Sequence, residues 1–408
     1  MAAPTPGPLT LTPAQRERLE RTARTLTAPY RDVLQAKILL YAADGYSHED
    51  IARRLDCDGR LVAETYAQFA ANGLPRLAGS AADSPEPAPV TVGASPVGLF
   101  PFGVPEASVL YAFAETAERL GFAGLWLGDH LTFHVPVLES LTFLTALAAR
   151  TERIKVGTSV YLLPLRHPTL VAKVTSTLDI LSGGRLIFGI GIGGENPSEF
   201  EANGTLVRQR ASRTEEGLLV LKRLWTEAHV THHGRHFHLT DITLEPRPLQ
   251  VPHPPIWVGG RSEAALRRAI RVGDGWVSVM VAPQRFRQSR QRLEELAQQQ
   301  GRCLEGFTFA HYAFLYLTED VAAGRRTAAE FLSRLYNLPF EPLLERCGIV
   351  VGPAEACIEQ LQRFIDAGVT YLILAPTCAA PEQVQQLELY ATYVLPHLQA
   401  TREEVQRR

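Results

Sequence analysis

The 408-residue sequence has little net charge, few cysteines and no long apolar run. Its 41 Lys and Arg nearly balance 43 Asp and Glu, and a net charge of −2 excludes a nucleic-acid binder that depends on bulk electrostatic attraction. Five cysteines without a C-x-x-C pair argue against a disulfide framework and a zinc ribbon. No stretch approaches the about 20 apolar residues of a membrane span, and the N-terminus lacks the pattern of a signal peptide. We therefore expect a cytoplasmic protein with reduced thiols and no membrane association.

A proline-rich segment divides the chain. Residues 78–90 read AGSAADSPEPAPV, where three prolines alternate with small or acidic residues. Such a composition neither buries a core nor continues a helix. We expect an N-terminal domain over 1–77, a Pro/Ala-rich linker over 78–92 and a larger domain over 93–408.

The N-terminal segment is predicted to be helical throughout. Ser47 and Asp50 form a capping-box variant before a short helix over 51–55. A polar turn at 56–59 then leads to a longer helix over 60–71, which completes a helix-turn-helix pattern. Two further helices are expected before it, starting at Thr12 and at Pro29. The stretch LTPAQRERLERTARTLTAPYRDVLQAKILLYAADGYSHEDIARRL resembles the homeodomain-like N-terminal module of insertion-sequence transposases and related regulators.

The larger segment alternates helices with short buried strands. Three times a helix ends at a glycine and an apolar strand follows, at 121–127, 273–279 and 368–374. Repeated units of this kind predict parallel strands with crossover helices, and a (β/α)8 TIM barrel fits best. A doubly wound open sheet is the alternative, which the lack of a G-x-G-x-x-G motif after the first strand disfavours. The candidate strands are Val97–Phe100, Leu125–Leu127, Lys155–Val160, Arg185–Ile190, Ile256–Val258, Trp276–Val279, Phe309–Leu317 and Tyr371–Leu374.

Function in such a barrel resides where strands end and loops begin. The second strand ends in Asp129 and His130, an acid and an imidazole suited to binding a polar ligand or exchanging protons. The alternative is a turn cap and a packing residue. The third strand ends in small hydroxyl residues, which would let a flat ligand approach the backbone. The alternative is that they are ordinary β-branched strand residues without a role in binding. The fourth ends in the glycines of 189–194, which either bare one strand face to a ligand or allow close backbone packing.

A phosphate site is predicted after the fifth strand. Gly259, Gly260, Arg261 and Ser262 precede a helix over 263–271. The amides of a glycine turn, a helix N-terminus and an arginine together suit a phosphate. The alternative is that Ser262 only caps its own helix.

Five histidines gather in the stretch AHVTHHGRHFHL, residues 228–239. Such a tract could bind a metal. No Cys, Asp or Glu interleaves with it, however, and Gly234 indicates the tip of a hairpin. We therefore expect no metal site here.

Three stretches together resemble the luciferase-like monooxygenase family. They are GFAGLWLGDHL (121–131), ARTERIKVGTSVYLLPLRHPTLVAKVTSTLDILSGGRLIFGIGIGGENPSEFEANG (149–204) and PPIWVGGRSEAALRRAIRVGDGWV (254–277). The resemblance implies a (β/α)8 barrel that binds FMN or the deazaflavin coenzyme F-420 at the carboxyl ends of its strands. It also implies an oxidoreductase, either a monooxygenase or a hydride-transfer enzyme, that acts on a small organic substrate. Relatives are commonly homodimers.

The resemblance also assigns roles to particular residues. Asp129 and His130 would be the catalytic residues beside the cofactor and the substrate. An acidic residue of the family falls at Gly194 here, with Glu195 one place on, so we do not expect Glu195 to be a direct proton donor. The cofactor-binding residues would be Ser159 and Val160 as a non-prolyl cis step behind the ring, Gly191, Ile192 and Gly193 beside it, and Gly259, Gly260 and Arg261 at the phosphate.

A second function remains open, that of a DNA-binding regulator whose barrel senses a flavin or another small molecule. Residues 1–78 hold ten Lys and Arg against nine Asp and Glu, a net charge of about +1. This segment therefore has little of the excess positive charge expected of a DNA-binding domain. We expect the N-terminal module to bind DNA weakly or not at all.

Overall fold

The computed structural model describes residues 90–398 and, before them, residues 9, 11, 12, 15, 16, 19, 20, 23, 30–55 and 59–72. Contacts within the chain divide it into two units, Met1–Glu86 and Pro87–Arg408. Most of the expected linker, 78–89, and most of the expected turn, 56–58, lie outside the described residues.

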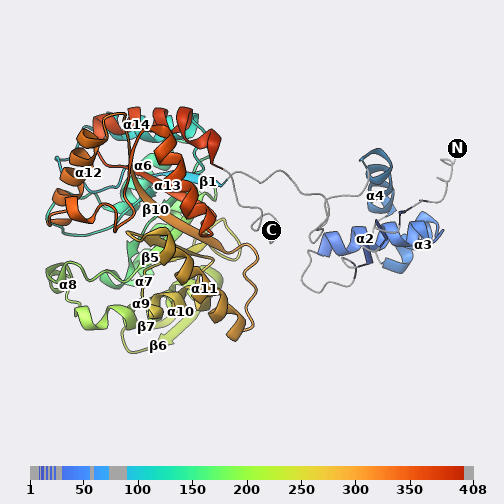
Figure 1. Ribbon diagram of the computed structural model, residues 1–408. Coiled ribbons are helices and arrows are strands. Elements are labelled where there is room, and N and C mark those ends of the chain that lie inside the picture. The colour runs from blue at the N-terminus through green and yellow to red at the C-terminus, as the bar shows by residue number, and fades with distance from the viewer. Residues whose placement is uncertain are drawn as a thin grey trace. The chain divides into compact units, whose positions relative to one another are not determined.

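Three helices make up most of the described N-terminal unit: α2 (Tyr30–Ala43), α3 (His48–Leu55) and α4 (Gly59–Asn72) (Figure 1). The predicted cap of the short helix is confirmed, because the Asp50 amide donates to Ser47 Oγ at 3.1 Å. An apolar cluster holds the helices together, and its fully buried members include Leu19, Ile38, Leu39, Ile51 and Val62.

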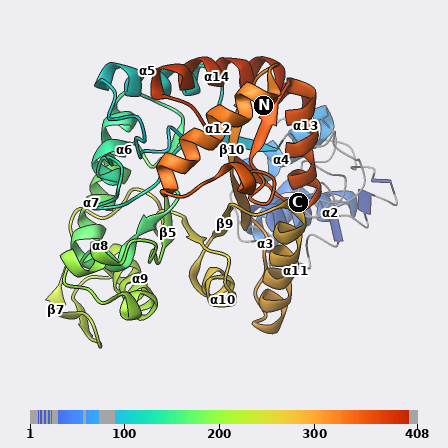
Figure 2. The ribbon, with the colours of Figure 1, turned by 60° about the vertical axis from the view of Figure 1, so that its left-hand side comes forward.

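Eight parallel strands close into a barrel in the larger unit (Figures 1 and 2). Pairing of the last strand with the first, and of the sixth with the seventh, leaves the ring without a gap, which excludes the doubly wound open sheet. Two short strands extend the ring: β4 (Tyr161–Leu162) beside β5 and β11 (Val350–Gly352) beside β10. In order around the ring the barrel strands are β1 (Thr91–Ala94), β2 (Gly124–Leu127), β3 (Lys155–Thr158), β5 (Leu186–Gly191), β8 (Ile256–Gly259), β9 (Gly275–Val279), β10 (Thr308–Leu317) and β12 (Tyr371–Pro376).

Helices surround the strands in both views (Figures 1 and 2). They are α5 (Ala107–Arg119), α6 (Ser140–Ala149), α7 (Pro168–Leu181), α8 (Pro197–Ala202), α9 (Arg210–Thr226), α10 (Glu263–Val272), α11 (Pro283–Gln299), α12 (Val321–Tyr336), α13 (Ala354–Asp366) and α14 (Ala380–Tyr393). Short 3-10 turns lie at η1 (Leu163–Leu165), η2 (Val207–Gln209), η3 (Glu341–Leu343) and η4 (Leu395–His397). Among the described residues no helix combines the length and the apolar character needed to cross a bilayer.

The first strand was predicted in the wrong place. It spans Thr91–Ala94 instead of Val97–Phe100, and so begins within the segment expected to be linker. Pro96 has no amide to donate to a sheet ladder, which ends the strand just before the apolar residues that attracted the assignment. Val97 adopts a φ of 67°, and Leu99 makes only an isolated bridge with Val137.

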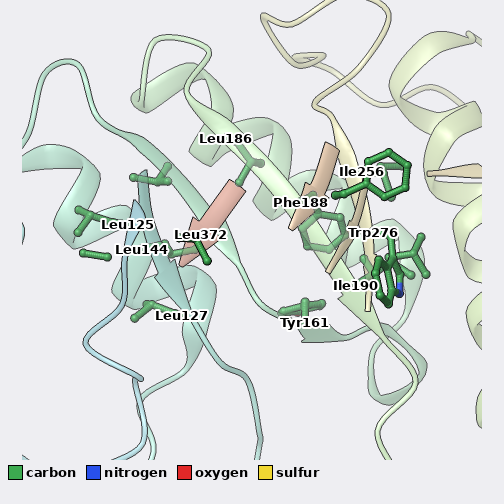
Figure 3. Close-up of a cluster of buried hydrophobic side chains, with 14 of the residues drawn as sticks. Leu125, Leu127, Leu144, Tyr161, Leu186, Phe188, Ile190, Ile256, Trp276 and Leu372 are labelled. Carbon is green, nitrogen blue, oxygen red and sulfur yellow. The ribbon is translucent and has the colours of Figure 1, made fainter. Parts of the chain in front are cut away.

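Alternating side chains of the strands fill two different layers. The outward-facing ones join apolar side chains of the helices in one buried cluster, whose strand members include Leu125, Phe188 and Ile256 (Figure 3). Inside the barrel, the rings of Trp126 and Trp257 stack with centroids 4.5 Å apart. The ring of Tyr371, the first residue of β12, packs edge-on against both tryptophans, with centroids 5.5 and 5.1 Å away. The barrel interior around these rings is therefore a packed core, and the carboxyl ends are left for function.

Candidate active site

Asp129 follows β2 and is fully enclosed by protein groups. Its side chain has 0% exposure. One carboxylate oxygen accepts from Ser140 Oγ at 2.8 Å, and the other accepts from the Leu162 amide at 2.9 Å. Arg166 completes the set with both of its terminal nitrogens. Asp129 thus joins the end of β2 to α6, to β4 and to the start of α7.

The ion pair between Asp129 and Arg166 is buried on both sides. The Arg166 side chain is 8% exposed, and its guanidinium lies 4.3 Å above the centre of the Tyr161 ring. Burial by itself would lower the pKa of Arg166, but the charge and hydrogen bonds of Asp129 outweigh burial and raise that pKa. Arg166 therefore stays charged at any physiological pH.

His130 is the next residue, and its imidazole meets a carboxylate from a distant part of the chain. Nδ1 lies 3.0 Å from Oε2 of Glu199 in α8. The Glu199 side chain has 0% exposure, whereas the imidazole is 14% exposed and stacks on Phe133 with centroids 4.0 Å apart. Among residues 90–398 this carboxylate is the hydrogen-bonding partner of the imidazole.

Glu199 also holds the backbone beside His130. Its Oε1 accepts from the amides of Leu131, at 2.5 Å, and Thr132, at 3.2 Å. Burial would raise the pKa of Glu199, but the hydrogen bonds from His130 and the two amides prevail and lower it. Glu199 is therefore an anion at neutral pH.

The peptide bond between Ser159 and Val160 is cis, as the resemblance implied. The nearby glycines make room for the Val160 side chain. A Cβ on Gly191 would lie 2.4 Å from Val160 Cγ2, and one on Gly259 would lie 2.7 Å from Val160 Cγ1. The bare strand faces are thus occupied by an apolar side chain, which favours close packing over direct ligand contact at these two glycines.

The loop after β5 turns in the left-handed region. Gly193 has a φ of 58° and Gly194 a φ of 122°, values that favour glycine. A Cβ on Gly194 would lie 3.0 Å from Nε of Arg210, so an acidic side chain at this position would contact a guanidinium. Ile192 is half-buried, and Glu195 is exposed.

The predicted phosphate loop lies at the start of α10. Ser262 Oγ accepts from the Ala265 amide at 3.3 Å, so Ser262 caps its own helix, while the phosphate role stays a prediction. Gly260 has a φ of 129° and is exposed together with Arg261. Arg261 Nη1 donates to the carbonyl of Met280, at 3.1 Å, just beyond β9.

The five histidines do lie on a hairpin, formed by β6 (Val230–His233) and β7 (His238–Ile242). Three of them interact with different partners. Nδ1 of His229 lies 2.7 Å from Asp241, Nε2 of His232 lies 3.1 Å from Glu216, and Nε2 of His236 lies 2.9 Å from Ser212 Oγ.

Two residues of this region escaped sequence reasoning, Glu199 and Arg166. The sequence does contain a signal for the start of α8, namely Asn196-Pro197 followed by an acidic residue in the first turn. Nothing local indicates that α8 turns its carboxylate toward a residue 69 positions earlier. Arg166 is separated from its partner by 37 positions and precedes a helix that begins at Pro168.

A closed parallel barrel that carries an imidazole and an arginine-bearing helix start at its strand ends has the architecture of a (β/α)8 enzyme. The chain belongs to the luciferase-like monooxygenase family, whose model matches residues 93–371.

Named relatives include enzymes with two different cofactors. The chain is 29% identical over 318 residues to an F420-dependent glucose-6-phosphate dehydrogenase of Microbacterium testaceum, covering 71% of this chain and 93% of that one. It is 40% identical over 139 residues to an FMNH(2)-dependent dimethylsulfone monooxygenase of Pseudomonas putida, covering 33% of this chain and 38% of the relative. The structure of the monooxygenase RslO1 from Streptomyces bottropensis matches with a TM-score of 0.68 at 24% identity, covering 75% of this chain and 99% of that one.

Proposed function

We propose that this protein is an oxidoreductase that uses FMN or the deazaflavin coenzyme F-420 on a small organic substrate, with His130 as the proton-exchanging residue. The observation that carries the proposal is the placement of two groups at one end of the barrel. The imidazole of His130 follows β2, and the helix start with Arg261 follows β8, with β3 and β5 between them in the ring.

The residues at this end fit a flat ring that carries a phosphate. Val160 and Met280 both pack against the apolar cluster that contains Trp126 and Trp257, which suits an aromatic ring system. Arg261 and the backbone amides at the start of α10 suit the phosphate. When bound, the ring supplies hydride transfer or oxygen activation. The protein then orients the substrate, excludes water and moves a proton at His130.

Binding and turnover with each cofactor separately test this proposal. The full-length protein is titrated with FMN and with F-420, followed by fluorescence. Oxidised F-420 is then offered with glucose 6-phosphate and a panel of primary and secondary alcohols, and reduced FMN is offered with dimethylsulfone in air. We expect micromolar or tighter binding of at least one cofactor and turnover in one arm. If neither cofactor binds, the proposal is wrong.

Arg261 is expected to bind the cofactor phosphate. Replacing Arg261 by Ala removes a charged donor worth about 1.5–3 kcal/mol, so Kd for FMN or F-420 should rise about ten- to hundredfold. Riboflavin, which is FMN without the phosphate, should bind both proteins about equally. Equal losses for FMN and riboflavin would contradict a phosphate role.

Arg267→Ala is a matched control for this variant. Arg267 lies on α10, the helix that follows Arg261, is half exposed and pairs with Glu263 at 2.7 Å. A surface pair of this kind contributes little. The control should bind both ligands like the unaltered protein.

The N-terminal unit, which we propose to be a helix-turn-helix module, is expected not to read DNA. Two arginines of α3 are engaged locally. Arg53 pairs with Asp50 at 3.2 Å, and Arg54 lies 4.4 Å above the Tyr46 ring. In α4, the proposed recognition helix, Val62 is buried in the core of the unit. Few groups remain for phosphates or base edges.

Selection of bound sequences from random DNA by the full-length protein at physiological salt measures this directly. We expect no enriched motif and only weak, salt-sensitive binding. Recovery of a defined motif at nanomolar affinity would contradict the prediction and favour a regulator.

A further inference from the structure

The side chain of Glu199 reaches from α8 to the loop after β2. Its carboxylate contacts three consecutive residues of the loop after β2, namely His130, Leu131 and Thr132. The neighbouring Asn196 donates from Nδ2 to the Thr132 carbonyl at 2.9 Å. One short segment after β5 therefore holds the whole turn that carries His130.

The segment that supplies Glu199 is itself firmly packed. Phe200, the next residue, has 0% exposure and forms an apolar cluster with Leu162 and Leu165. Leu131 packs against the same cluster. The polar contacts of Glu199 thus rest on a buried apolar contact between the same two loops.

The chemistry of these contacts decides which imidazole nitrogen carries the proton. Both carboxylate oxygens of Glu199 are acceptors, because the carboxyl is ionised at neutral pH. An acceptor 3.0 Å from Nδ1 requires that Nδ1 donates. A neutral imidazole has only one N–H, so Nε2 is then left with a free lone pair.

We propose that Glu199 is a positioning residue that holds neutral His130 with its proton on Nδ1, so that Nε2 accepts a proton from the substrate. Glu199 acts through His130 and the adjacent backbone and does not touch the substrate. This inference rests on the proposed role of His130. It goes further in naming the reacting atom and the group that selects it. With the oxidised deazaflavin coenzyme as the hydride acceptor, a bound alcohol would lose its carbon-bound hydride to that coenzyme and its hydroxyl proton to Nε2, and would leave as a carbonyl compound.

Glu199→Gln reverses the preference while keeping the shape of the side chain. The amide oxygen of the glutamine can still accept from Leu131 and Thr132. Its NH₂ group then faces Nδ1 of His130, and two donors cannot pair. The imidazole should therefore move its proton to Nε2 and lose its ability to accept one there.

Glu118→Gln is a matched control at the other end of the barrel. Glu118 accepts from the amides of Glu152, Arg153 and Ile154, just before β3, at 3.0, 2.6 and 2.9 Å. Burial raises the pKa of Glu118, but these amides prevail and lower it, as for Glu199. The two carboxylates differ in that only Glu199 also contacts an imidazole.

Histidine-selective ¹⁵N NMR on the full-length protein, without any ligand, reads the tautomer directly. The signal of His130 is assigned by its loss in His130→Asn, and spectra are taken at about pH 8.5, where an ordinary imidazole is neutral. We expect the Nδ1–H form in the unaltered protein and in Glu118→Gln, and the Nε2–H form in Glu199→Gln. An Nε2–H form in the unaltered protein would overturn the proposal, and this measurement requires no variant of Glu199 to fold.

Turnover with the cofactor and substrate pair found in the assays above gives the second measurement. Glu199→Gln should lower kcat by about 100-fold, within the range of general-base effects, with little change in the Kd of the cofactor. Glu199→Asp, which keeps the charge, should recover part of that loss. If the unaltered protein turns over nothing, the proposed function fails, while the tautomer measurement still decides the role of Glu199. If Glu199→Gln shows the Nε2–H form and full kcat, the proton acceptor is another group.

Discussion

Replacing His130 by Ala should lower kcat/KM by about 100-fold or more, because a positioned general base contributes about 10²–10⁴ to the rate. The side chain is 14% exposed, and Nδ1 contacts Glu199. Within residues 90–398, Nε2 makes no hydrogen bond and is left for a ligand. Stability should change little, because the Glu199 carboxylate keeps the Leu131 and Thr132 amides as donors when the imidazole is removed. Steady-state kinetics and urea unfolding of the same preparations measure the two effects.

His134→Ala is the control for this prediction. His134 lies in the same loop and is exposed. Like His130, it contacts the ring of Phe133, with centroids 4.1 Å apart. It should retain nearly full kcat/KM. A His130→Ala protein that unfolds easily but turns over normally per folded molecule would show that the imidazole is only structural.

Much of the barrel could be predicted because its repeats are local. A helix that ends at glycine and an apolar strand that follows are encoded within about 15 residues, and seven of the eight barrel strands lie where the sequence placed them. The exception is the first strand. There, apolar character at Val97 and Leu99 outweighed the constraint of Pro96, which backbone hydrogen bonding does not allow inside a ladder.

The candidate site was less predictable, because its contacts join distant segments. Position along a strand correctly placed His130 and Arg261 at the carboxyl ends. It could not show that the Asp129 carboxylate accepts hydrogen bonds from Ser140, the Leu162 amide and Arg166. Nor could it show that Glu199 is the partner of His130.

Glycines illustrate the same limit. A glycine in a strand predicts that something approaches closely, but not what it is. At Gly191 and Gly259 that neighbour is Val160, a residue of this chain. Any contact of these glycines with a cofactor stays a prediction.

Arg166 should be the most costly side chain of this region to remove. Arg166→Leu leaves the Asp129 carboxylate buried without its counter-charge, and breaking a buried pair in this way costs about 3–5 kcal/mol. Arg150→Leu is the matched comparison. Arg150 also pairs with a carboxylate, at 2.5 Å, and lies 5.4 Å above a tyrosine ring, but its side chain is 53% exposed. Its loss should cost at most about 1 kcal/mol.

A double variant separates the unpaired charge from the lost packing. Asn at position 129 carries no charge that would be left buried without a partner. Its side-chain oxygen can still accept from the Leu162 amide. Asp129→Asn combined with Arg166→Leu should therefore be more stable to urea than Arg166→Leu alone, a departure from additivity expected of directly paired residues. The coupling should be about 1–3 kcal/mol, in the range measured for residues in contact. Purely additive losses would mean that the Asp129 charge finds water or another partner when Arg166 is gone. The pair would then stabilise the loop through packing against Tyr161 and not through its charges.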